Sequence, residues 1–201
     1  MKKLTILMVL VAFTVATQAQ KIKLVSGDLT FLKGEKSLNL QYNYDNVMVG
    51  DKQEADYIKK KVSEYNAKEA GKGDKWLENW KNDRKTRYEP KFEELFNKYL
   101  EEISIKAKEN DVAAKYTVLI KTKMIEPGFN VGVMRRPAKI DVVVEVSASG
   151  SPENKLAEFT IYDIPGADVM GYDFDSGERI SEAYAKLGKA LAKYIVKNTG
   201  K

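Results

Sequence analysis

Residues 140–146 read Ile-Asp-Val-Val-Val-Glu-Val, and every second position from Ile140 to Val146 carries a branched apolar side chain. This period of two predicts a strand with one buried face. Two further alternating segments flank it, residues 115–125 before it and residues 156–164 after it. Because a short Ser-Ala-Ser-Gly-Ser-Pro turn joins the last two of these strands, we expect sequential strands to pair antiparallel.

A fourth strand is predicted closer to the N-terminus, within a segment of β character at residues 23–44. Residues 38–44 read Leu-Asn-Leu-Gln-Tyr-Asn-Tyr, which places apolar and aromatic side chains on one face and amides on the other. Residues 29–32 are a candidate partner strand across a turn at residues 34–36. We expect the strand at 38–44 to join the other three.

Two amphipathic helices are predicted to cover this sheet. One begins near Pro90, a residue type that suits the first turn of a helix, and its apolar stripe continues to Ile103. The other spans residues 176–197 and also carries one continuous apolar stripe. A helix with a single apolar face needs an apolar surface to cover, and the sheet supplies it.

A shorter pair of helices is predicted between these elements. Asp51 and Glu54 have the spacing of a capping box for the first helix, and Asp74 is a candidate cap for the second. The predicted fold is therefore an α+β two-layer sandwich. It has a mostly antiparallel sheet of about four or five strands covered by two amphipathic helices, with residues 51–88 as an inserted helical pair.

The N-terminus has the pattern of a signal peptide. Two lysines precede an apolar run that ends at Val15, and small residues suit cleavage after Ala19. The alternative is a retained N-terminal anchor, for which the apolar run is short. We expect residues 1–19 to be a signal peptide and residues 20–201 to form a single exported domain, periplasmic or extracellular, with no later transmembrane segment.

The composition removes several kinds of chemistry. The 201-residue chain has no histidine and no cysteine, which excludes His-ligated metals, zinc and iron–sulfur sites, thiol nucleophiles, disulfides and a lipid-bearing cysteine. Its formal charge is +5, which falls to +3 without the two signal-peptide lysines. So small a charge does not indicate a nucleic-acid partner. We expect no catalytic residue, no cofactor and no metal.

Two groups of residues are candidates for contact with a partner. Trp76 and Trp80 lie four residues apart among basic residues, where they can stack on sugar rings or instead anchor a short helix on the domain. Arg135 and Arg136 lie in a loop rich in glycine and proline. Such a pair can grip a carboxylate or phosphate, or can act as a charged guard at a loop or strand edge.

Acidic residues gather between Leu156 and Glu178, a stretch with six carboxylates and no basic residue. Asp173 and Asp175 begin a run that resembles a calcium loop but departs from the EF-hand pattern. Asp175 with Glu178 fits the N-terminal cap of the last helix better. Paired carboxylates could serve glycoside hydrolysis, whereas a solvated acidic loop is the simpler interpretation.

Two resemblances extend these predictions. Residues 16–20, 128–130 and 172–180 resemble a family of secreted or periplasmic Bacteroidota proteins to which no activity is assigned. The order β–α–β–β–β–α resembles, in topology only, envelope helper domains such as the TolB amino-terminal domain and the lipoproteins that activate peptidoglycan synthases. The second resemblance implies a helper role in the envelope, although shared topology does not transfer function.

These observations predict an exported non-enzymatic protein that binds a cell-envelope partner, either another envelope protein or a glycan, and no nucleic acid. The alternatives are a carbohydrate- or small-ligand-binding protein that uses Trp and Tyr stacking, and a carboxylate-based hydrolase. The candidate surface residues are Trp76, Trp80, Arg135, Arg136, Asp173 and Asp175.

Overall fold

A computed structural model describes residues 22–131, 133–166 and 175–199. The predicted signal peptide at residues 1–19, its cleavage site, and the acidic residues Asp168 and Asp173 lie outside the described residues. Within the described ranges, no helix is long and apolar enough to cross a membrane. In chain order the elements are β1 (Ile22–Gly27), η1 (Thr30–Leu32), β2 (Ser37–Asn43), β3 (Met48–Val49), β4 (Lys52–Gln53), α1 (Glu54–Asn66), α2 (Lys72–Asp83), η2 (Arg84–Tyr88), α3 (Glu89–Leu100), η3 (Glu101–Ile103), β5 (Lys106–Glu109), β6 (Tyr116–Glu126), β7 (Phe129–Asn130), β8 (Arg135–Arg136), β9 (Lys139–Ala148), β10 (Ser151–Pro165) and α4 (Ser176–Thr199).

The main sheet is mixed, with the order β1-β10-β9-β6-β2-β5 and the short β3 and β4 attached beside the end of β6. β6, β9 and β10 pair antiparallel, as the sequence predicts. β2 instead pairs parallel with both β5 and β6, so the sheet is less antiparallel and has more strands than predicted. The helical segment between β2 and β5 carries the chain back along the sheet, so β5 runs in the same direction as β2.

The first strand lies at the edge of the sheet rather than in a hairpin. Residues 29–32, a candidate partner strand, instead contain the 3₁₀ turn η1, which buries Leu32. β1 pairs antiparallel with β10, from Ile22 opposite Ile161 to Gly27 opposite Ala157. The strand at residues 38–44, for which residues 29–32 were the candidate partner, pairs with β5 and β6 instead.

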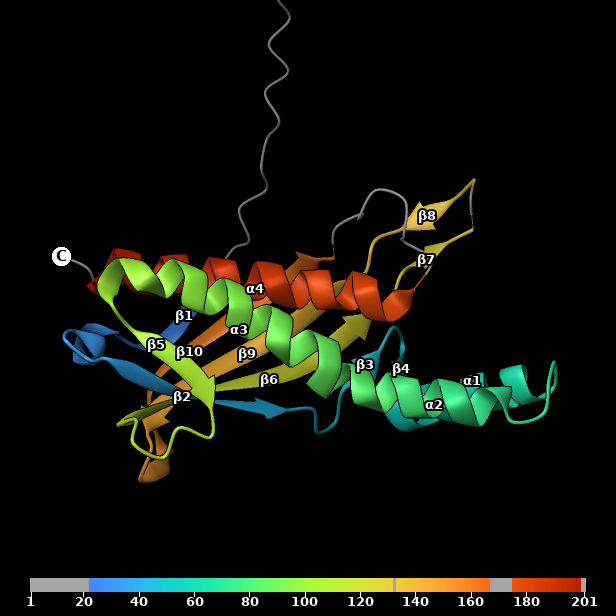
Figure 1. The fold of residues 1–201 in the computed structure, drawn as a ribbon, viewed down its shortest axis with the longest axis horizontal. Coiled ribbons are helices and arrows are strands. Elements are labelled where there is room, and N and C mark those ends of the chain that lie inside the picture. The colour runs from blue at the N-terminus through green and yellow to red at the C-terminus, as the bar shows by residue number, and fades with distance from the viewer. Residues whose placement is uncertain (1–21, 132, 167–174, 200–201) are drawn as a thin grey trace, which may run out of the picture.

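Helices α3 and α4 lie side by side over one face of the sheet (Figure 1). Their apolar stripes meet the inner faces of the long central strands in a single core, so the fold is the predicted α+β sandwich of one sheet and one helical layer. Large side chains that are almost completely buried in this core include Phe92, Phe96, Leu100, Ile120, Phe159 and Tyr184.

The opposite face of the sheet carries charged side chains that pair with one another. Glu145 oxygens lie 2.7 Å from both Lys121 Nζ and Lys155 Nζ, and Lys155 Nζ also lies 2.7 Å from a Glu158 oxygen. Burial opposes ionisation of Glu145, but the two ammonium groups hold its pKa below the usual value. The charged side chains of this face thus satisfy one another, and the face needs no covering layer.

Helices α1 and α2 form a pair, here called the helical arm, which extends past the end of the sheet (Figure 1). α2 continues through the π-helical turn η2 into α3, so residues 72–100 form one rod rather than two separate helices. The wide turn ends two residues before Pro90, which has no N–H to donate and whose ring would crowd a regular helix.

The predicted caps of the arm are wrong. α1 begins at Glu54 and not at Asp51, because residues 49–52 form the tight β3–β4 turn, where Gly50 adopts a φ of 59°. The Glu54 carboxylate instead accepts a hydrogen bond from Trp80 Nε1 at 2.7 Å and pairs with Arg84. A buried indole N–H needs an acceptor, and that demand outweighs the capping pattern. Asp74 does not cap α2 either, because it lies inside that helix, and the N–H of Gly73 in the first turn donates to Asn66 Oδ1 at 2.7 Å instead.

Gly188 lies where α4 meets α3, and a Cβ there would be only 2.4 Å from the Phe92 carbonyl oxygen. We predict that Gly188→Ala lowers the free energy of unfolding by about 1–3 kcal/mol because the helices must separate. Alanine in an exposed helix would instead add about 1 kcal/mol of stability. Denaturant unfolding measures the change, with Gly150→Ala as the control at a glycine surrounded by open space. Equal or higher stability of Gly188→Ala would contradict the packing argument.

Asp83, at the end of α2, makes a pH-dependent contribution to the free energy of unfolding. Burial raises the pKa of Asp83 to about 6, against the opposing effect of Arg87, whose Nε lies 3.1 Å from its carboxylate. Folding therefore favours the protonated carboxyl, and the stability it contributes is lost as pH rises from about 4 through about 6. We predict that the unfolding free energy of the wild type relative to Asp83→Asn falls by about 1 kcal/mol over this window. Urea unfolding at the two pH values tests this, and a constant or rising difference would refute it.

Candidate functional site

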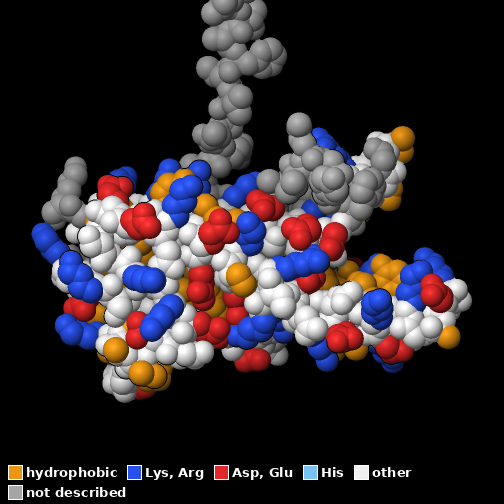
Figure 2. Space-filling view, viewed as in Figure 1, with side chains coloured by type: hydrophobic (Ala, Val, Ile, Leu, Met, Phe, Trp, Pro, Cys, Tyr) orange, Lys and Arg blue, Asp and Glu red, His pale blue; other side chains and the backbone are white. Residues whose placement is uncertain are grey.

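An open cleft lies at the end of the sheet, between α1 and a hairpin that β7 and β8 form at residues 129–136. In Figure 2 the surface is indented between the helical arm and this hairpin. The cleft has a volume of about 690 Å³, and its apolar lining comes from the β3–β4 turn, α1, the end of β6 and the loop after it. These apolar residues are Val49, Tyr57, Met124 and Pro127.

Tyr57 forms the helical wall of the cleft, and the predicted Trp pair lies behind it. The Tyr57 ring centroid is 5.9 Å from that of Trp76 and 5.4 Å from that of Trp80, and the two indoles stack on each other. Trp80 is buried and Trp76 half-buried. The tryptophans thus hold α2 against α1 and support Tyr57. Burial raises the pKa of Tyr57 to about 12, so its phenol is a neutral hydrogen-bond donor at physiological pH.

The opposite wall is held by a buried arginine that the sequence analysis did not single out. Arg179, in the first turn of α4, donates from Nε to the Pro127 carbonyl oxygen at 3.1 Å and from Nη2 to the Gly128 carbonyl oxygen at 3.3 Å. Gly128 has a φ of 64°, and a Cβ there would lie 2.2 Å from the Arg136 carbonyl oxygen. The available signal was an arginine at a helix N-terminus, where the helix dipole disfavours a cation.

The cleft carries more positive than negative side chains. Its cationic residues are Lys52, Lys60, Lys61, Arg136 and Lys139, and its acidic residues are Asp51, Glu126 and Asp163. Each of these carboxylates has a cation within 4 Å, the closest pair being Lys139 Nζ and Asp163 Oδ1 at 2.8 Å.

Two lysines on α1 share one carboxylate. Lys60 Nζ and Lys61 Nζ lie 3.7 and 3.8 Å from the two oxygens of Glu64, so this wall has one more positive than negative charge. Lys61 Nζ also lies 5.8 Å from the Tyr57 ring centroid. Ammonium groups beside a neutral phenol and an aliphatic floor can bind an anionic group attached to an apolar or sugar-like body.

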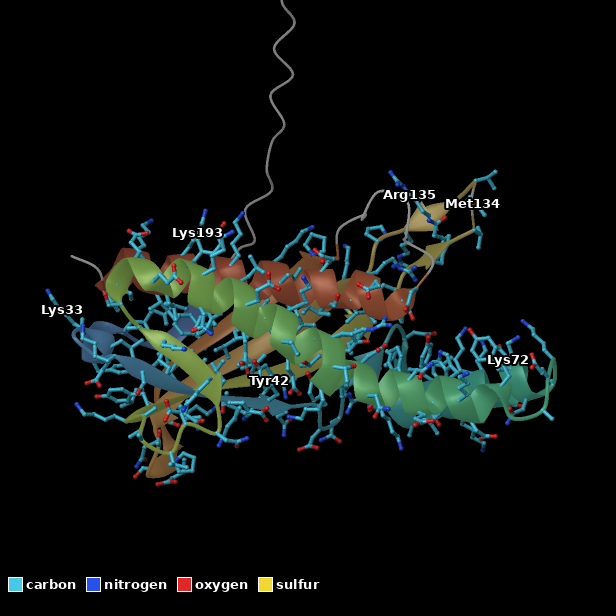
Figure 3. The ribbon with its side chains drawn as sticks, viewed as in Figure 1. Lys33, Tyr42, Lys72, Met134, Arg135 and Lys193 are labelled. Atoms are coloured by element: carbon cyan, nitrogen blue, oxygen red, sulfur yellow. The ribbon has the colours of Figure 1, made fainter. Side chains whose placement is uncertain are left out.

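The predicted arginine pair divides between the cleft and the hairpin. Arg136 lines the cleft, and its Nη1 lies 3.4 Å from Glu126 Oε2. Arg135 precedes it on β8 and is exposed on the projecting hairpin, as Figure 3 shows. The structure therefore brings Arg136 and the Trp-supported Tyr57 into one cleft.

Asp175 lies elsewhere and is structural. Its Oδ1 accepts from the Gly177 N–H at 2.8 Å, which confirms the predicted cap of α4, and its Oδ2 lies 2.6 Å from Arg87 Nη1. Although burial opposes ionisation, these contacts hold the pKa of Asp175 below its usual range. Asp173, the remaining candidate, lies outside the described residues. Across residues 22–131, 133–166 and 175–199, no group of three or more Asp or Glu side chains is arranged to hold a metal ion.

Comparisons with known proteins give weak similarities. No family model matches the chain, and no curated protein matches its sequence. Among solved structures, the PelC dodecamer from Paraburkholderia phytofirmans is 10% identical with a TM-score of 0.41, over 86% of this chain and 97% of that one. A variant of that dodecamer is 11% identical with a TM-score of 0.36, over 84% and 97%. A Xanthomonas campestris protein of the DUF330 family is 14% identical with a TM-score of 0.34, over 54% and 60%. Similarities this low carry no functional argument.

The clamp made by Arg179 is testable. We predict that Arg179→Met lowers the free energy of unfolding by about 2–3 kcal/mol, because two carbonyl groups lose charge-assisted hydrogen bonds. Amide hydrogen exchange should accelerate at residues 127–138 more than in β9. Arg179→Lys keeps the charge but not both contacts. Its stability and its exchange rates should lie between those of the wild type and Arg179→Met. Exchange at 127–138 that stays at the wild-type rate in Arg179→Met would show that the clamp does not hold the hairpin.

Proposed function

We propose that the protein is exported and acts in the periplasm or outside the cell as a non-enzymatic protein that binds a cell-envelope partner. The observation that carries the proposal is the open cleft, in which five cationic and three acidic side chains accompany an aromatic wall and an aliphatic floor. The signal-peptide pattern at residues 1–19 supports export, and so does the resemblance to secreted Bacteroidota proteins.

Binding rather than catalysis suits the side chains of the cleft. Its carboxylates are engaged in ion pairs with Lys52, Arg136 and Lys139. Carboxylate oxygens so engaged are less available for general acid–base work on a substrate. The composition offers neither histidine nor cysteine as a substitute. The carboxylate-based hydrolase is therefore the least supported of the alternatives.

The charge of the cleft favours an anionic ligand group. Lys60 and Lys61 face it from α1, and Arg136 faces it from the hairpin. An anionic group between them would be attracted by cations on both walls. The apolar part of the same ligand could contact Tyr57 and Met124. Because the cleft is open to solvent, it can take one segment of an extended polymer or chain as well as a small molecule.

A glycan is the second candidate ligand, and one observation favours it. The Tyr57 ring lines the cleft and is held in place by the two indoles behind it, which is how a rigid stacking surface for a sugar ring is built. An acidic glycan would use this ring and the cations together, whereas a neutral glycan would use the ring alone.

The cations of α1 provide the test. We predict that Lys60→Glu with Lys61→Glu weakens the binding of an acidic oligosaccharide, such as an oligogalacturonate, by at least about tenfold because attraction becomes repulsion. Calorimetric titration measures the affinity, and a polyglutamate peptide serves as a second anionic probe. Tyr57→Ala should weaken the oligosaccharide and leave the peptide nearly unaffected.

The matched control is Lys98→Glu with Lys197→Glu, the same charge change at exposed sites near the other ends of α3 and α4. This control should keep its affinity. If both double variants lost the same affinity, net charge alone would explain the effect, and the cleft would not be the binding site. A wild-type chain that binds neither probe would contradict an anionic ligand.

A further inference from the structure

The hairpin at residues 129–136 exposes an aliphatic tip to water. Among the described residues, eight large hydrophobic side chains are exposed, and four of them lie on this hairpin: Phe129, Val131, Val133 and Met134. Val133 is 94% exposed and Met134 62%. Exposed apolar residues are ordinary when scattered, but a group on one projection marks an interaction surface. Figure 3 shows Met134 and Arg135 on this projection, away from the helices.

The tip does not serve the fold. Backbone bonds join the two sides of the turn, from the Val131 N–H to the Met134 carbonyl oxygen at 3.0 Å and from the Val133 N–H to the Val131 carbonyl oxygen at 3.1 Å. A polar side chain at Val133 or Met134 would leave these backbone bonds intact. The apolar side chains therefore contribute nothing that the isolated domain requires.

Cations lie directly behind the tip. Residues 127–140 contain Arg135, Arg136 and Lys139 and no acidic residue. Glu126 and Asp163, which come from neighbouring segments, pair with Arg136 and Lys139 respectively. From its end towards the body, the hairpin thus presents aliphatic side chains first and guanidinium groups second.

We propose that the hairpin tip inserts into the surface of a membrane that contains anionic phospholipids. A bilayer surface has the same order as the hairpin, with acyl chains inside and phosphates outside them. Val133 and Met134 would enter the acyl boundary while Arg135 contacts the phosphate level. Insertion stays shallow because the turn backbone has polar groups that hydrocarbon cannot satisfy. A protein groove with its own hydrogen-bonding groups fits less well, since the tip side chains have none.

This inference goes beyond the proposed function, because the described tip residues Phe129, Val131, Val133 and Met134 do not line the cleft. Its failure is therefore distinguishable from failure of the cleft. The tip variant Val133→Ser with Met134→Ser should keep the affinity of the wild type for the anionic probes of the cleft.

The experiment is vesicle co-sedimentation of the chain from Gln20 onwards, with vesicles of phosphatidylcholine alone or mixed with phosphatidylglycerol. We expect binding to the mixed vesicles and at least about a tenfold loss of partitioning in Val133→Ser with Met134→Ser, from the lost burial of two apolar side chains. Arg135→Gln should reduce the preference for the mixed vesicles. Val112→Ser is the matched control, because Val112 is 98% exposed in the loop between β5 and β6, away from the hairpin.

A fluorescent label gives an independent measurement of depth. Since the chain has no cysteine, Val133→Cys and Val112→Cys each provide one labelling site. An environment-sensitive dye at residue 133 should shift to the blue on mixed vesicles, and the dye at residue 112 should not. Three results would overturn the proposal: unchanged partitioning of the tip variant, a dye at residue 133 that stays in water while the protein sediments, or absence of vesicle binding. Self-association that the tip variant abolishes, without vesicle binding, would assign the tip to a second copy of the chain instead.

Discussion

The close packing of α3 on α4 at Gly188 is the constraint on which the rest of the molecule depends. The missing side chain lets the α4 backbone approach the Phe92 carbonyl group, and the two helices then cover the sheet as one layer. Because α3 is the second half of a continuous rod, fixing α3 also fixes the direction of α2 beyond the sheet. Packing at Gly188, far from the arm, therefore sets the position of the arm. It also sets the position of Tyr57, which forms one wall of the cleft.

The other wall depends on the same helix by a different route. α4 begins with Arg179, whose guanidinium group holds the two carbonyl groups at the base of the hairpin. Asp175 and Arg87 then join the start of α4 to η2, at the point where the rod leaves the sheet. Contacts at the N-terminal end of α4 therefore help to position both walls of the cleft. This arrangement explains why an open cleft can keep its shape without an element that crosses it.

The sequence predicted the layers of the fold and not the connections between them. Alternation at 140–146 and the apolar stripe of 176–197 are local periodicities, which the chain expresses wherever its partners lie. The parallel pairing of β2 is not local, since it follows from where the chain re-enters after α3. The predicted capping box at Asp51 is wrong for a related reason. The Glu54 carboxylate accepts a hydrogen bond from Trp80, which lies 26 residues away in the sequence. The sequence predicted Arg136 as a member of a basic pair. It did not predict the cleft that Arg136 lines, because the lining residues come from separate segments between residues 49 and 163 and form no contiguous motif.

The distribution of polar and apolar surface concentrates function at one end of the molecule. One face of the sheet is covered by α3 and α4, and on the other Glu145 and Glu158 neutralise Lys121 and Lys155. At the end of β6, by contrast, cations outnumber acids and aliphatic side chains face water. Exposed Val133 contributes nothing that an isolated domain needs, since a polar residue at this position would fold as well. Stability does not explain this exposed side chain, so contact with something outside the chain is the physical reason that remains.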